Sequence, residues 1–256
     1  MARKKRVMRA VAAVGRLTLF TGSLILLAAN ARSHVLSSPR FSLAHIAVEG
    51  NAHVTSRDII ARSGIAEREN IFKVDLAGSA RAIREIPWIL DARVWRNLPD
   101  EICIEITERR LLALVPSSGL YYVGGGGKVI AGFDPSEGAR VPFITAKGFG
   151  PLKPGDTLKT EGIAEALEIV RLMAAMGIGE NIAISEINID DPSNIVMVAQ
   201  RSGANIFLGS GDLKGKLWRL SRVAGAIDRN ENLRIEDLEK VDLRFGATVP
   251  TKLKGG

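Results

Sequence analysis

The first 31 residues constrain the fold of this chain more than any other stretch, because a basic cluster there precedes a long apolar run. Five of the first nine residues are lysine or arginine, and the run from Val11 to Ala31 is interrupted by Arg16. Such a run approaches the roughly 20 residues that cross a bilayer as a helix, with Arg16 extending toward the inner face. The pattern therefore predicts a membrane-spanning anchor helix.

A cleavable signal peptide is the alternative explanation of the same residues. Leu17 to Leu27 would then form its apolar core, and Ala29-Asn30-Ala31 would be a small-x-small cleavage site. The basic cluster argues against a third explanation, a buried helix of a soluble protein. Both leading explanations place the body of the chain outside the cytoplasm, since basic flanks stay on the cytoplasmic side.

The net charge of +7 comes from the N-terminal segment. Residues 1–40 contain no acidic residue and eight basic ones: Arg3, Lys4, Lys5, Arg6, Arg9, Arg16, Arg32 and Arg40. Removing those eight from 35 basic residues leaves 27 against 28 acidic ones, so residues 41–256 carry −1. Nucleic-acid binding is driven largely by the release of counterions when basic side chains neutralise phosphates, and a body without excess positive charge lacks this contribution. Nucleic acid is therefore not an expected partner.

Residues 41–115 have the pattern of a small unit with the order strand, helix, helix, strand, strand. The stretch from Ser33 to Arg40, with serine and proline, is expected to be the linker before it. Thr55, with Asp58 three residues later, predicts a helix N-cap, and Gly64 is placed to end that helix. The other expected elements are a strand from Phe41 to Gly50, a helix from Asp75 to Pro87, and strands Ile89–Asn97 and Glu101–Thr107 joined by Leu98-Pro99-Asp100.

From Val115-Pro116 onward, short strands and turns predict a second, β-rich domain over residues 116–249. Apolar residues at helical spacing predict two helices in it, from Gly162 to Met176 and from Leu213 to Ile227. Expected strands are Leu120–Val123, Val129–Ile130, Val141–Thr145, Ile184–Ile189, Ile195–Ala199, Asn205–Leu208 and Val241–Gly246, before a polar tail over 250–256. The tryptophans are expected to be core or half-buried: Trp88, Trp95 and Trp218.

Four consecutive glycines, Gly124 to Gly127, precede Lys128 and resemble part of a phosphate-binding loop. The P-loop pattern also requires a glycine at position 122 and a hydroxyl residue at 129, where this chain has Tyr122 and Val129. No helix pattern follows that would point its N-terminus at a phosphate. We predict instead a hairpin turn, because glycine adopts positive φ without steric cost, and an unusually loose tip.

No catalytic, metal-binding or cofactor-binding residues are predicted, and no cofactor or small-molecule substrate is expected. The histidines, His34, His45 and His53, lack the i, i+4 spacing of helical metal ligands. Cys103 is the only cysteine, so it cannot form an internal disulfide or a Cys-based metal site. The chain also lacks a G-x-S-x-G nucleophile elbow. These features favour a binding module over an enzyme.

Several short motifs carry a family resemblance. They are V-E-G-N after the first strand, N-I-F-x-V-D entering the second helix, P-W at its end, R-x-L-P-D at the hairpin and E-R-R closing the third strand. With them, residues 41–115 resemble a POTRA domain, in particular that of the FtsQ/DivIB family of bacterial division proteins. The stretch from Val241 to Phe245 is similar to a V-D-L-R-Y motif at the end of that family's second domain.

The resemblance implies an α+β protein with a membrane helix, a POTRA domain and a second mixed β-rich domain. The implied divisions are a cytoplasmic tail (1–10), a transmembrane helix (11–31), a linker (32–40), the POTRA domain (41–115), the C-terminal β domain (116–249) and a tail (250–256). It favours a retained anchor over a cleaved signal peptide. It also implies a single-pass inner-membrane protein at the division septum, with a cytoplasmic N-terminus and a periplasmic body.

A C-terminal strand at 241–246 is expected to lie at a sheet edge and to pair with a strand of another chain, with Pro250 limiting that pairing. The resemblance implies FtsB- and FtsL-like partners, other divisome members besides, and the role of a non-enzymatic scaffold that links early to late division proteins. The residues it points to are Arg244, Phe245, Gly246, Ala247 and Thr248. The alternative is a secreted or membrane-tethered POTRA chaperone or transport accessory.

Overall fold

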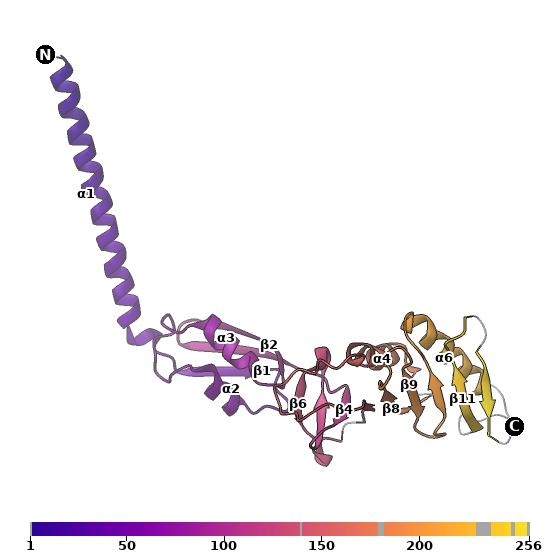
Figure 1. Cartoon of the computed structure of the whole chain (residues 1–256). Coiled ribbons are helices and arrows are strands. Elements are labelled where there is room, and N and C mark those ends of the chain that lie inside the picture. Colours follow the sequence, from indigo (N-terminus) through magenta and orange to yellow (C-terminus); the bar gives the residue numbers. More distant parts are fainter. Residues whose placement is uncertain (1, 139, 179–181, 229–236, 247–248, 255–256) are drawn as a thin grey trace. The chain divides into compact units, whose positions relative to one another are not determined.

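A computed structural model describes residues 2–138, 140–178, 182–228, 237–246 and 249–254. The chain divides into two compact units. The first contains the residues up to 84 together with 91–107, and the second contains 85–90 together with the residues from 108 onward. The α+β class is confirmed, with helices and strands in both units (Figure 1).

The N-terminal segment forms one long helix, α1 (Ala2–Ser37). Its part from Thr18 to Ser37 is long and apolar enough to cross a membrane, the one such helix among the described residues. The helix continues through residues 32–37, where a linker was expected, because no helix breaker occurs before Pro39. Ser38 is extended (φ −70°, ψ 127°), as the residue before a proline prefers, and this ends α1.

The first unit has the expected order of strand, two helices and a two-stranded hairpin. Its elements are the 3₁₀ helix η1 (Pro39–Phe41), β1 (His45–Glu49), α2 (Ser56–Ser63), α3 (Leu76–Arg84), β2 (Ile89–Asn97) and β3 (Glu101–Glu108). The Thr55 side chain accepts a hydrogen bond from the Asp58 backbone N–H, and Gly64 is left-handed with φ 69°. Both predicted ends of α2 are therefore confirmed.

In the three-stranded sheet of this unit, β3 lies between β1 and β2, and β1 runs parallel to β3. The alternation in β3 places Ile102, Ile104 and Ile106 in the core, each at most 4% exposed. Trp95 on β2 is 43% exposed, so the expectation of a core or half-buried position was wrong for it. Asn97, two residues later and on the same side of the strand, is also exposed, because that side does not face the core.

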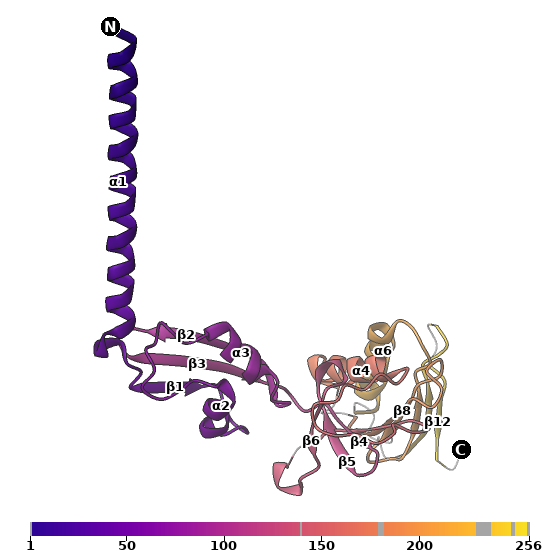
Figure 2. The same ribbon diagram turned by 60° about the vertical axis from the view of Figure 1, so that its left-hand side comes forward.

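Among its described residues, the second unit has a nine-stranded sheet, with the α-helices α4 and α6 on one side of it (Figure 2). The strand order is β12-β11-β10-β9-β8-β7-β4-β5-β6. The strands are β4 (Ala113–Pro116), β5 (Leu120–Val123), β6 (Val129–Gly132), β7 (Phe143–Thr145), β8 (Ile184–Asn188), β9 (Val196–Ala199), β10 (Asn205–Phe207), β11 (Leu238–Asp242) and β12 (Thr251–Leu253). The helices described in this unit are α4 (Ile163–Ala175), α6 (Leu213–Asp228) and the short 3₁₀ helices η2 (Gly125–Gly127) and η3 (Pro135–Glu137). Residues 113–115, expected at the end of the first domain, thus pair within this second sheet.

One cross-strand row forms the centre of the core. Its residues lie in register on neighbouring strands and are fully buried: Ile144, Ile187, Met197, Ile206 and Val241. Leu167 of α4 and Leu217 of α6 belong to the same core. Trp218, the next residue of α6, points outward and is 52% exposed, against the expectation for it.

The four glycines connect β5 to β6, which confirms the predicted turn. Gly126 and Gly127 have φ of 71° and 73°, and the Gly124 N–H donates to the Lys128 carbonyl at 2.9 Å. The expectation of a loose tip was wrong. Gly127 is buried, and the Leu158 N–H donates to its carbonyl at 2.8 Å, so the turn is packed against a distant segment.

The last predicted strand also needs correction. We expected 241–246, but β11 ends at Asp242, and the polar tail contributes a further strand, β12. The reason is local, because the Asp242 carboxylate accepts a hydrogen bond from the Arg244 backbone N–H at 3.1 Å. Such hydrogen bonds from a side chain to the backbone compete with the backbone hydrogen bonds between strands, and they turn the chain out of the strand.

Candidate functional site at the C-terminal sheet edge

The described residues of the predicted partner site lie in the bend between β11 and β12. Arg244, Phe245 and Gly246 are all exposed there. The other two predicted residues, Ala247 and Thr248, lie outside the described residues. The structure therefore brings three members of the predicted site together, on a turn rather than on a strand.

Arg244 is held in place by a buried carboxylate. Asp242 is 3% exposed, and its two oxygens accept hydrogen bonds from Arg244 Nε at 2.9 Å and Arg244 Nη2 at 2.6 Å. This is the two-pronged geometry in which arginine binds carboxylates best. The Arg244 side chain lowers the pKa of Asp242 below its ordinary value of 3.8, and the carboxylate in turn raises the pKa of Arg244.

Phe207 of β10 packs against Lys240 and Arg244 beside the same bend. The Arg244 guanidinium carbon lies 4.9 Å from the centre of its ring, and Lys240 Nζ lies 4.7 Å from it. Both distances are within the range of cation–π attraction. A further hydrogen bond runs from Arg244 Nη1 to Asn194 Oδ1 at 3.2 Å. Arg244 thus links β10, β11 and the segment just before β9, and is less available than a free surface arginine.

Phe245 is the apolar side chain that this bend presents outward. It is 58% exposed, whereas Leu243, two residues earlier, is fully buried. Exposed aromatic side chains are the usual anchors of protein–protein interfaces. Within the predicted set, Phe245 is therefore the residue best placed to contact a partner.

Strand β12 forms the edge of the sheet, which sequence reasoning missed. The Pro250 carbonyl accepts from the Asp242 N–H at 2.9 Å, and the Lys254 N–H donates to the Asp237 carbonyl at 2.8 Å, so these groups face β11. Alternation then directs the N–H and C=O groups of Thr251 and Leu253 outward. No described strand pairs with that outer side. The only sequence signal was three residues long, too short to show a period.

The rest of the described chain offers little for chemistry. Its residues include no cluster of three or more His, Cys, Asp or Glu side chains that could hold a metal ion. Lys128, which follows the glycines, donates through Nζ to the Gly155 carbonyl. Its amino group is therefore engaged by the backbone, as expected of a turn.

These features define a class of protein: a chain with one helix suited to a membrane span, a small β-α-α-β-β domain and a β-rich second domain. Residues 41–109 match the domain family described as "POTRA domain, FtsQ-type". The chain is 32% identical to the "Cell division protein FtsQ" of Anaeromyxobacter sp. (strain K) over 208 residues, 77% of this chain and 68% of the relative. It is 26% identical to the protein of that name from Syntrophotalea carbinolica over 235 residues, 92% of this chain and 82% of the relative.

A third relative of the same name, from Myxococcus fulvus, is 27% identical over 215 residues, 84% of this chain and 75% of the relative. The chain belongs to the FtsQ family of cell division proteins. Family membership and the N-terminal helix together fit a single-pass membrane protein.

Proposed function

We propose that this chain is a non-enzymatic scaffold of the bacterial divisome that docks FtsB- and FtsL-like partners at its C-terminal sheet edge. The observation that carries the proposal is the outer side of β12, where the N–H and C=O groups of Thr251 and Leu253 have no described partner strand. An extended segment of another chain gains main-chain hydrogen bonds by adding to such an edge. Phe245, exposed on the adjoining bend, supplies an apolar contact beside it.

The same proposal includes the location. The chain sits in the inner membrane through α1, with the N-terminus in the cytoplasm and both folded units in the periplasm at the septum. The basic cluster from Arg3 to Arg9 supports this orientation, because basic flanks remain on the cytoplasmic side. N-terminal sequencing of the mature protein tests it. A chain that begins at Arg32 would show cleavage and would exclude the anchor.

Replacing Thr251 with proline tests the edge directly, since proline lacks the N–H that would pair with the partner. The matched control is Thr251→Ala, which removes the side chain and keeps the N–H. Binding of the extracytoplasmic segment of the FtsB-like protein from the same bacterium is measured on the full-length chain. We expect Thr251→Pro to weaken binding more than tenfold and Thr251→Ala to leave it close to wild type.

Circular dichroism and thermal unfolding of both variants establish that the sheet persists. If Thr251→Pro is folded and binds its partner as tightly as Thr251→Ala does, pairing at β12 is excluded as the docking mode.

A further inference from the structure

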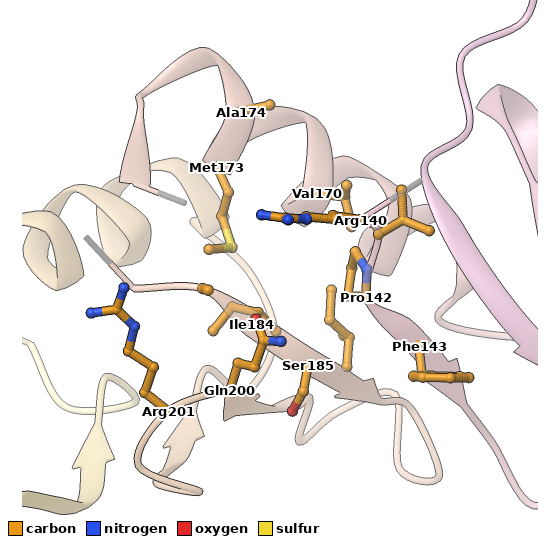
Figure 3. A pocket seen from close by; sticks show the side chains of 13 residues that line it. Arg140, Pro142, Phe143, Val170, Met173, Ala174, Ile184, Ser185, Gln200 and Arg201 are labelled. Carbon is orange, nitrogen blue, oxygen red and sulfur yellow. The ribbon is translucent and has the colours of Figure 1, made fainter. Parts of the chain in front are cut away.

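A groove of about 650 Å³ opens in the second unit, away from the C-terminal edge (Figure 3). It lies at the starts of β7 and β8, beneath the C-terminal half of α4. Its volume is within the range of pockets that bind small ligands or a few side chains. Side chains that line it include Arg140, Phe143, Val170, Met173, Ile184 and Arg201.

The walls of the groove are mostly apolar. Val170 and Met173 come from α4, and Ile184 comes from β8. Phe143, the first residue of β7, lines the groove and is 38% exposed, so part of this apolar surface faces water. A concave apolar surface of this kind favours an apolar occupant.

Two arginines contribute to the lining of the groove. In Figure 3 the Arg140 side chain reaches over the groove, and Arg201 lies on another part of the lining. No aspartate or glutamate is among the described lining residues. Arg140 is exposed and forms no ion pair with a described acidic residue. The guanidinium group of such an exposed arginine can bind a carboxylate through two parallel hydrogen bonds.

We propose that this groove docks a short segment of a partner protein in which one carboxylate is flanked by apolar side chains. The apolar flanks pack on Val170, Met173 and Phe143, and the carboxylate accepts hydrogen bonds from Arg140. The groove is distinct from the C-terminal edge: four strand spacings separate β8 from β12, which is about 19 Å at ~4.8 Å per strand. One bound partner segment at either site therefore leaves the other accessible.

Capped nine-residue peptides labelled with fluorescein provide the probe. Each contains one aspartate among leucine, valine, phenylalanine and serine, and each has a twin with asparagine in place of the aspartate. Fluorescence anisotropy measures their binding to the full-length chain in lipid nanodiscs. We expect aspartate peptides to bind and their asparagine twins to bind about tenfold more weakly, as the loss of a charge-assisted hydrogen bond predicts.

Two pairs of variants assign the binding to the groove. Arg140→Ala should weaken binding of the aspartate peptides about tenfold. Arg171→Ala is the control and should leave their binding unchanged, because Arg171 of α4 lies beside Glu168 and Gly125 rather than in the groove. Ala174→Asp places a negative charge in the lining and should abolish binding. Ala175→Asp places it at the next exposed position, outside the lining, and should not.

Three results would each overturn the proposal. They are failure of every peptide to bind, equal binding of aspartate peptides and their asparagine twins, and equal binding by the two members of either variant pair.

Discussion

The two edge strands of the nine-stranded sheet, β6 and β12, differ in whether another described segment of the chain pairs with their outer side. At the β6 edge, residues 155–158 run alongside and hydrogen-bond to it: the Val129 N–H donates to the Asp156 carbonyl, and the Gly155 N–H to the Val129 carbonyl, both at 2.9 Å. At the β12 edge, no described segment pairs with the outer side. An unpaired strand edge invites association with other chains, and proteins normally cover it. The contrast shows that this fold can cover an edge and does so at one end.

The covered edge depends on glycine. A Cβ at Gly127 would lie 2.9 Å from the Leu158 carbonyl oxygen, and the residue has positive φ. The glycine run thus allows residues 155–158 to approach β6 closely. At the other end, Gly246 is exposed, with nothing within 4 Å of where its Cβ would be. Among the described residues, Gly246 therefore has no close backbone contact comparable with that of Gly127.

The largest effect is expected from breaking the covered edge. Gly127→Ala combines backbone strain at positive φ with a clash against the Leu158 backbone, and should lower the free energy of unfolding by about 3 kcal/mol. Gly126→Ala is the matched control, because Gly126 has nearly the same φ (71° against 73°) but open space where its Cβ would be, and should cost about 1 kcal/mol. Urea unfolding of the full chain measures both. Equal losses would show that the contact with residues 155–158 does not constrain the turn.

A second test compares one exposed phenylalanine at each edge. If the aromatic ring is an interface anchor, Phe245→Asp at the open edge should weaken binding of the FtsB-like partner by about 2 kcal/mol, roughly 30-fold in affinity. Phe133, just after β6, is 42% exposed and provides the control. Phe133→Asp disturbs a ring contact with Tyr122 at 5.7 Å, so it should affect stability and leave partner binding unchanged. Equal partner binding by the two variants would remove Phe245 from the docking surface.

Local signals in the sequence were sufficient for much of the fold. The Thr55 cap, the Gly64 stop and the hairpin at residues 98–100 each depend on a few neighbouring residues, and the structure contains all three. The periodicity of α4 was equally clear, since its apolar residues recur over 13 residues. Features of this kind are encoded within one turn or one strand, so they can be predicted without knowing the tertiary structure.

Features that depend on distant pairing could not be predicted. Strand β12 has three residues, and it is a strand because β11 lies beside it. The burial of Gly127 depends on Leu158, about 30 residues away. The exposure of Phe245 and the brace between Asp242 and Arg244 follow from where β11 ends, which was expected four residues later. The site could therefore be located in the sequence, but its edge and its geometry could not.

The smallest expected effect concerns the Asp242–Arg244 brace at the open edge. Arg244→Met removes both hydrogen bonds to a buried carboxylate, and should lower the free energy of unfolding by about 1 kcal/mol at pH 7, because the Arg244 side chain is 39% exposed and solvent weakens the pair. Arg171→Met removes an exposed pair with Glu168 and should cost less than about 0.5 kcal/mol.

The pH dependence separates the brace from simple loss of packing. The Arg244 side chain holds the pKa of Asp242 below 3.8 in the folded state, so the stabilisation is fully present above that value. It is lost as pH falls through the lowered folded pKa, where Asp242 becomes protonated. Urea unfolding at pH 7, 5 and 3 should therefore show a gap between wild type and Arg244→Met that persists at pH 5 and narrows at pH 3. A gap of constant size would mean that Arg244 stabilises the bend through its packing on Phe207 rather than through the carboxylate.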